Sequence, residues 1–83
     1  MAARPTLDGM TRGTTARIVA VDWGALAPAE GKRLQALGID TGTVITMAHK
    51  GVFGSADPLA IRIGRMTVAV RRVHGQAIAV EPT

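Results

Sequence analysis

Two histidines, His49 and His74, are the side chains of this sequence with the widest chemical repertoire. With a carboxylate such as Asp8 or Asp57 they could hold a transition-metal ion, because such ions accept imidazole and carboxylate ligands. The histidines are far apart in the sequence, however, and neither belongs to an H-x-H or H-x-x-x-H pattern that would place two ligands on one face of a strand or helix. A structural or solvated role is therefore favoured, and a metal-binding chaperone or sensor stays an alternative.

The other reactive residue types form no catalytic arrangement. Ser55 is the only serine and lacks the G-x-S-x-G pattern of a serine hydrolase. The segment Gly51–Ser55 lacks the lysine and the spacing of a phosphate-binding loop. The aspartates lie next to glycine, proline or another turn former, where aspartate shapes the backbone. Since there is also no cysteine, we expect a protein that is not an enzyme and holds no cofactor.

Arginine dominates the charge of the chain. The 10 basic and 6 acidic residues give a net charge of +4, which permits contact with an acidic surface. Trp23 and Phe53 are the only aromatic residues, too few stacking platforms to favour a nucleic-acid binder, which stays an alternative. We predict instead a protein-binding surface made of one loop and the arginines that follow it. Its candidate residues are Lys50, Val52, Phe53, Asp57, Arg62, Arg65, Arg71 and Arg72.

The first half of the chain predicts a strand and a short helix within a single domain, residues 1–83. Residues 14–21 are rich in β-branched side chains and read as a strand. Residues 29–37 predict a helix, because Pro28 suits a first helical turn and Gly38 can end the helix in a left-handed conformation. A second strand is predicted over residues 43–49, followed by a loop over residues 50–58.

Residues 59–70 predict a β-hairpin whose turn is Gly64-Arg65, since glycine suits the first central position of a two-residue turn. Residues paired across such a hairpin share a face of the sheet. The face predicted to point inward carries Leu59, Ile61, Ile63, Met66, Val68 and Val70. The opposite face carries Ala60, Arg62, Thr67, Ala69 and Arg71.

The chain after the hairpin predicts one helical turn over residues 72–75 and a closing strand over residues 76–80. Five strands and a short helix favour a mainly β fold, a small SH3-like barrel that is partly open. An OB-fold, which has similar elements, is the nearest alternative. No apolar run approaches the roughly 18 residues that span a bilayer. We therefore expect a cytoplasmic protein that reaches a membrane only through a partner.

A series of short motifs runs through the chain in a fixed order. The first half contains Leu7-x-x-Met10-x-x-Gly13-x-x-Ala16-x-Ile18 and Arg33-Leu34-x-x-Leu37-Gly38-Ile39-x-x-Gly42-Thr43-x-Ile45. The second half contains Phe53-Gly54, Asp57-Pro58-Leu59-Ala60-Ile61, Arg62-Ile63-Gly64, Val68-Ala69-Val70-Arg71-Arg72 and Ala77-Ile78-x-Val80. Together, these motifs resemble the ferrous iron transport protein A (FeoA) family over nearly the whole chain.

The resemblance implies an SH3-like barrel that works in the cytoplasm with FeoB, the ferrous-iron transporter that carries the GTPase domain and the pore. A protein of this kind would dock on FeoB and regulate transport or GTP hydrolysis, without an active site of its own. This chain departs from the family pattern where Thr41 and Val52 replace prolines and where Ser55-Ala56 precede Asp57. The departures in the loop bear on any partner contact that the loop makes.

Overall fold

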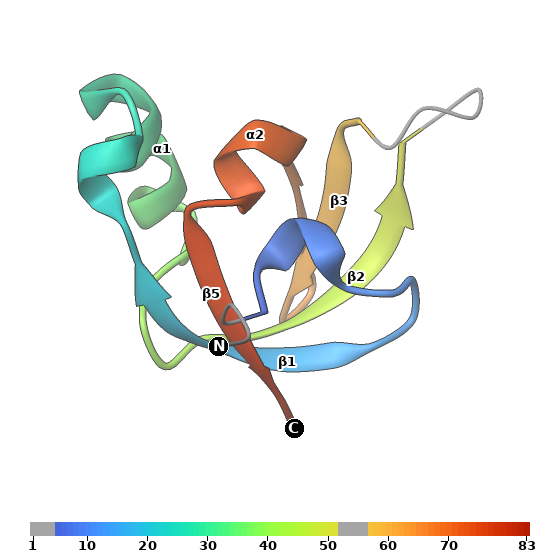
Figure 1. The fold of residues 1–83 in the computed structure, drawn as a ribbon. Helices are drawn as coiled ribbons and strands as arrows, with labels where there is room; N and C mark the ends of the chain where they lie inside the picture. The colour runs from blue at the N-terminus through green and yellow to red at the C-terminus, as the bar shows by residue number, and fades with distance from the viewer. Residues whose placement is uncertain (1–4, 52–56) are drawn as a thin grey trace.

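The structure is a computed structural model that describes residues 5–51 and 57–83 of the chain. This part of the chain contains five strands and four short helices (Figure 1). In chain order the elements are η1 Leu7–Gly9, β1 Thr15–Val21, η2 Trp23–Ala25, α1 Pro28–Ala36, β2 Val44–Lys50, β3 Leu59–Ile63, β4 Met66–Val70, α2 Arg72–Gly75 and β5 Ile78–Pro82. The mainly β fold that the sequence predicts is confirmed.

The five strands form one antiparallel sheet in the order β4-β3-β2-β1-β5. The sheet curls around a common interior, as a small SH3-like barrel does (Figure 1). Bulges interrupt the pairing of β1 with β5 between Ile18 and Ala20, and of β2 with β3 between Met47 and His49. A bulge bends its strand and increases the local twist. The bulges therefore help a five-stranded sheet to curl within so few residues.

The β3–β4 hairpin has the register that its sequence predicts. Leu59 pairs with Val70, Ile61 with Val68, and Ile63 with Met66. Gly64 opens the turn with φ of 59°, in the left-handed region that glycine adopts without a Cβ clash. The two-residue turn thus fixes which face of both strands points inward.

The predicted inward face of the hairpin is buried at one end only. Leu59, Ile61, Val68 and Val70 are buried, whereas Ile63 is half-buried. The prediction that Met66 is buried is wrong, because 42% of this residue is exposed. Ile63 and Met66 stand next to the turn, where the hairpin extends past the interior of the barrel.

The core draws side chains from every strand, from α1 and from the segments that flank β1. None of the described residues contributes a buried polar side chain to it. Its members are Leu7, Met10, Ala16, Ile18, Leu26, Leu34, Ile39, Ile45, Met47, Leu59, Ile61, Val68, Val70, Ile78 and Val80. Leu7 and Met10 enter it from the N-terminal segment, which lies across the strands in Figure 1.

Helix α1 begins and ends at the residues that its sequence signals. Pro28 occupies the first turn, and Gly38 follows the helix with φ of 100°, a value that suits glycine. The amide of Ile39 donates to the carbonyl of Leu34 at 3.0 Å, which closes the helix end. Leu34 is fully buried and Leu37 is half-buried, so this face of the helix covers one end of the barrel.

The boundaries of several elements differ by one or two residues from the predicted ones. The helix covers Pro28–Ala36 instead of residues 29–37, and the closing strand covers Ile78–Pro82 instead of residues 76–80. Strand β2 extends to Lys50, which the sequence places in the loop. Within the described ranges, no helix is long and apolar enough to cross a membrane.

Candidate functional site

An open cleft of about 510 Å³ lies between α1 and one end of the β3–β4 hairpin. It brings together residues of α1 and two residues that the sequence predicts to contact a partner, Asp57 and Arg71. The full lining is Glu30, Arg33, Asp57, Pro58, Ala69 and Arg71. Ligand sites in proteins commonly have volumes of about 300–1,000 Å³. The cleft is therefore the candidate functional site of this chain.

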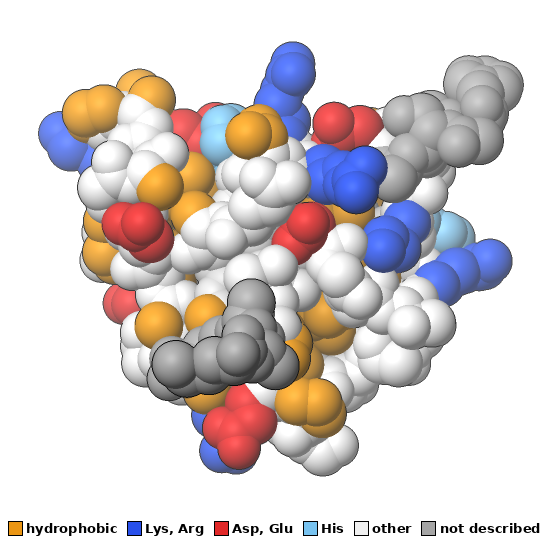
Figure 2. Space-filling model, viewed as in Figure 1, with side chains coloured by type: hydrophobic (Ala, Val, Ile, Leu, Met, Phe, Trp, Pro, Cys, Tyr) orange, Lys and Arg blue, Asp and Glu red, His pale blue; other side chains and the backbone are white. Residues whose placement is uncertain are grey.

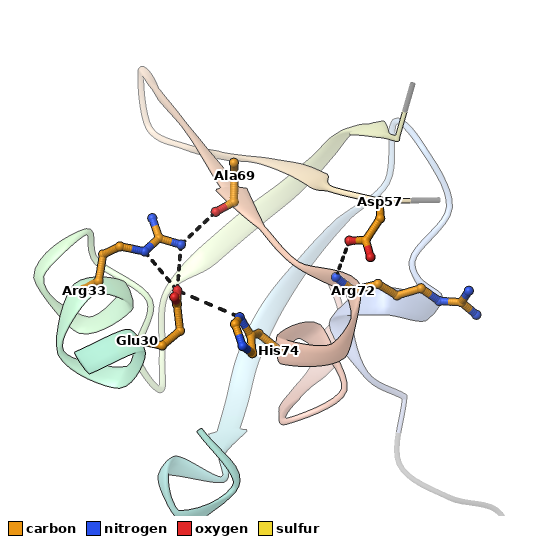
Figure 3. Close-up of polar contacts among 6 residues, drawn as sticks. All are labelled: Glu30, Arg33, Asp57, Ala69, Arg72 and His74. Atoms are coloured by element: carbon orange, nitrogen blue, oxygen red, sulfur yellow. Dashed lines mark hydrogen bonds and ion pairs between the residues drawn. The ribbon is translucent and has the colours of Figure 1, made fainter. Parts of the chain in front are cut away.

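Arg33 connects α1 with strand β4 at the side of the cleft. Its Nε and Nη2 atoms lie 2.9 and 2.7 Å from Oε1 of Glu30, one helical turn earlier. The same Nη2 donates a hydrogen bond of 3.0 Å to the backbone carbonyl of Ala69 (Figure 3). Because 47% of the Arg33 side chain is exposed, water screens the ion pair, and its contribution to stability is modest.

His74 of α2 points toward the same carboxylate (Figure 3). Its Nδ1 atom lies 3.9 Å from Oε1 of Glu30, which is beyond hydrogen-bonding distance. This nitrogen is buried and has no hydrogen-bond partner. Glu30 thus lies between the guanidinium group of Arg33, on the same helix α1, and the imidazole of His74, on α2, which is distant in the sequence.

Asp57 and Lys50, two of the candidate residues, make contacts that hold separate parts of the chain together. Oδ1 of Asp57 accepts a hydrogen bond of 2.7 Å from the backbone amide of Arg72, where α2 begins (Figure 3). Nζ of Lys50 donates a hydrogen bond of 2.9 Å to the backbone carbonyl of Asp8. The sequence predicts that both residues contact a partner, and in the structure both make contacts within the chain.

The four hairpin arginines do not form one cluster. Arg65 lies in the turn at one end of the hairpin, whereas Arg71 and Arg72 follow β4 at the other end. An extended strand rises about 3.3 Å per residue, so Arg65 and Arg71 are about 20 Å apart along the chain. Arg62 lies between the two ends, exposed on β3. Val52 and Phe53, the remaining candidates, lie outside the described residues.

Basic and acidic side chains are interspersed on the surface that Figure 2 shows. Most of the basic side chains in this view lie over α2 and the strand ends beside it, with carboxylates among them. Such a surface differs from the continuous basic stripe that is typical of nucleic-acid binders.

The two histidines lie in different surroundings. His49 is exposed on β2 and lines a shallow depression with Gly51, Pro58 and Ala60. His74 is half-buried on α2 and faces Glu30, a residue that lines the candidate cleft. In the described part of the chain, no group of three or more histidine, cysteine, aspartate or glutamate side chains is placed to hold a metal ion.

Sequence reasoning missed the contribution of α1 to the site. Glu30 and Arg33 are three residues apart, a spacing that places them side by side on a helix. This spacing is a usable signal for their ion pair. The bond from Arg33 to Ala69 joins residues 36 positions apart, and no local pattern predicts it.

Comparison with known proteins places the chain among proteins of ferrous iron transport. A family model described as the FeoA domain matches residues 6–82. No curated protein sequence gives a significant match.

Several solved structures are similar in fold. The FeoA protein of Chlorobium tepidum is 24% identical, with a TM-score of 0.81 over 94% of this chain and 70% of that protein. Iron(II) transport protein A of Clostridium thermocellum is 22% identical, with a TM-score of 0.80 over 95% of this chain and 46% of that one.

Stenotrophomonas maltophilia FeoA is 27% identical, with a TM-score of 0.77 over 93% of this chain and 89% of that protein. That protein was crystallised with zinc. It is described as a prokaryotic SH3 domain protein and put forward as a bacterial ferrous iron transport activating factor. The SH3-like barrel expected from the sequence is thereby confirmed.

Proposed function

Because the chain belongs to the FeoA family, we propose that it is a small cytoplasmic accessory protein of ferrous iron uptake that docks on a FeoB-type GTPase-permease and regulates it. The observation that carries this proposal is the FeoA-domain match over residues 6–82. The role put forward for S. maltophilia FeoA, an activating factor of iron transport, supports regulation. GTP hydrolysis and the iron pore then belong to the partner, and this chain contributes binding.

The docking surface that we propose is the candidate cleft and the hairpin beside it. Arg33 lies on α1, and four further arginines are spread along the hairpin and just after it, namely Arg62, Arg65, Arg71 and Arg72. Glu30 and Asp57 are the carboxylates that line the cleft. The excess of positive charge favours an acidic partner surface, because complementary potentials accelerate encounter and exclude wrong partners.

The segment after β2, which the sequence predicts to be a loop, is a second part of the proposed surface. Lys50 ends β2 and Asp57 precedes β3, so both ends of the loop are fixed in the barrel. Val52 and Phe53 are the apolar candidates between them. An apolar anchor beside a charged rim is the usual composition of a protein interface.

Binding to the purified cytoplasmic domain of a FeoB-type permease tests the proposal. We expect the wild-type chain to bind and to change the rate of GTP hydrolysis by that domain. The variant Arg71→Glu should bind about tenfold more weakly, because it places a negative charge in the cleft. Arg12→Glu is the matched control, since it makes the same charge change at an exposed residue that does not line the cleft.

Two results would overturn the proposal. One is that the wild-type chain does not bind the permease domain, together with normal ferrous uptake in a strain that lacks this gene. The other is an equal loss of affinity in Arg71→Glu and Arg12→Glu, which would place the docking surface elsewhere.

A further inference from the structure

The two edge strands of the sheet, β5 and β4, differ in whether another segment of the chain covers them. The edge of β5 is covered by the N-terminal segment, since Thr6 bridges Ala79 and the amide of Val80 donates to the carbonyl of Pro5 at 2.9 Å. Strand β4 pairs with β3 on one side, and no other strand in the described chain lies along its opposite side. An open strand edge exposes unpaired backbone groups to which another chain can bind.

The register of the hairpin shows which backbone groups of β4 point outward. In a hairpin with a two-residue turn, the pair Ile63–Met66 next to the turn is hydrogen-bonded, and the pairs then alternate. Thr67 and Ala69 therefore direct their N–H and C=O groups away from β3. Both residues are exposed. Among the described residues, only Arg33 bonds to these groups, at the carbonyl of Ala69.

The candidate cleft lies directly beside this edge. Ala69 and Arg71 line it on the β4 side, and Glu30 and Arg33 line it on the α1 side. The helix approaches β4 through the side chain of Arg33, as Figure 3 shows. The cleft is thus open beside Ala69, and Thr67, which does not line the cleft, is exposed farther along the same edge.

We propose that this edge of β4 accepts an extended acidic segment of a partner protein as an added antiparallel strand. The added segment would exchange backbone hydrogen bonds with Thr67 and Ala69, the mode of recognition known as β-strand addition. The identity of the partner in this inference rests on the proposed function. The mode of binding rests on the β4 edge alone.

The charges beside the edge favour an acidic occupant. From Arg62 to Arg72 the chain carries four arginines and no carboxylate. Arg33 adds a fifth arginine, against the carboxylates that line the cleft, Glu30 and Asp57. A second copy of the chain fits this edge poorly in the register that pairs Thr67 with Ala69. If Thr67 of one copy faced Ala69 of the other, Arg65 would face Arg71 in both copies, and like charges opposite each other destabilise a strand pair.

Arg33 has a specific part in this binding. It occupies the Ala69 carbonyl, which an added strand needs as an acceptor. A carboxylate on the incoming segment can accept hydrogen bonds from the Arg33 guanidinium. A backbone N–H of that segment then replaces the guanidinium as the donor to the Ala69 carbonyl. Arg33 is bonded to a single oxygen of Glu30 and is half-exposed, so this exchange requires no rearrangement of the core.

Titration of the isotope-labelled wild-type chain with a synthetic peptide tests the inference. The probe is a peptide of about eight residues that alternates glutamate with valine, and the matched control replaces each glutamate by lysine. We expect the acidic peptide to shift the amide signals of Thr67 and Ala69 and to slow their hydrogen exchange about tenfold or more. The lysine peptide should bind about tenfold more weakly.

Two variants separate backbone pairing from simple charge attraction. Ala69→Pro removes an N–H that points away from β3, so it should weaken binding of the acidic peptide about tenfold. Ala69→Val retains this N–H and should therefore lose less affinity than Ala69→Pro. Since proline can also disturb the strand, the exchange measurement on the wild-type chain stands as independent evidence.

Three results would overturn the inference. These are an absence of change at Thr67 and Ala69 under saturating peptide, equal affinity for the acidic and lysine peptides, and a dimer of this chain that protects the β4 edge. Binding of the acidic peptide without binding of the permease domain would refute the proposed function and leave the β4 site intact. Binding of the permease domain without protection of Thr67 and Ala69 would refute only the β4 site.

Discussion

Gly75 shows how a single residue can be fixed by its tertiary surroundings. It ends α2 and is buried, and a Cβ atom placed on it would lie 3.0 Å from Cδ1 of Leu59 and 3.2 Å from the backbone nitrogen of Asp8. The leucine side chain can move, but the backbone of Asp8 belongs to η1. Close packing between α2 and η1 thus favours glycine here, and nothing in the local sequence indicates it.

We expect Gly75→Ala to lower the free energy of unfolding by about 1–3 kcal/mol, the usual cost of overpacking. Gly9→Ala is the matched control, because nothing lies within 4 Å of its added Cβ. The control should be neutral or slightly stabilising. Urea unfolding followed by circular dichroism measures both variants. Equal stability of the two variants would contradict the packing described for Gly75.

At the scale of elements, the β3–β4 hairpin is the part that local sequence specifies best. Its register follows from a two-residue turn that begins with glycine, and all of its predicted pairs are present. The depth of each side chain does not follow from the register. Met66 and Val68 are on the same face, yet 42% of Met66 and 4% of Val68 are exposed. Depth depends on where the rest of the barrel covers the hairpin.

This difference in depth predicts unequal effects of truncation on one face. Ile61→Ala should cost about 2–5 kcal/mol of unfolding free energy, because the fully buried side chain leaves a cavity in the core. Met66→Ala should cost less than about 1 kcal/mol, since its side chain is partly in water. Thermal unfolding of both variants in the same buffer makes the comparison. A cost for Met66→Ala close to that for Ile61→Ala would show that the turn end of the hairpin is covered.

For the whole molecule, the distribution of charge matters more than the net value of +4. Basic side chains gather on one part of the surface in Figure 2, with carboxylates among them, while the chain from Arg62 to Arg72 carries basic residues without acidic ones. Long-range attraction from such a surface acts mainly on the rate of association and weakens with salt.

We therefore expect the association rate with the permease domain to fall several-fold as the salt concentration rises from about 0.05 M to about 0.5 M. The dissociation rate should change much less, because it depends on short-range contacts. Surface plasmon resonance at several salt concentrations separates the two rates. If salt changed only the dissociation rate, electrostatic steering by the arginines would have no part in docking.

The sequence by itself determined the features that depend on neighbouring residues. Turn and cap glycines such as Gly38 and Gly64, the helix start at Pro28 and the alternation along the hairpin are all local, and local conformational preference predicts them. The order of the motifs was sufficient to indicate the family.

Only the tertiary structure decided which residues meet. The strand order that leaves β4 at an edge, the bond from Arg33 to Ala69, and the approach of His74 to Glu30 join segments that are distant in the sequence. Such contacts depend on how the sheet curls and where α1 and α2 come to lie, and no local pattern carries that information. The residues that line the candidate cleft come from segments that are distant in the sequence, so local patterns could not predict the cleft.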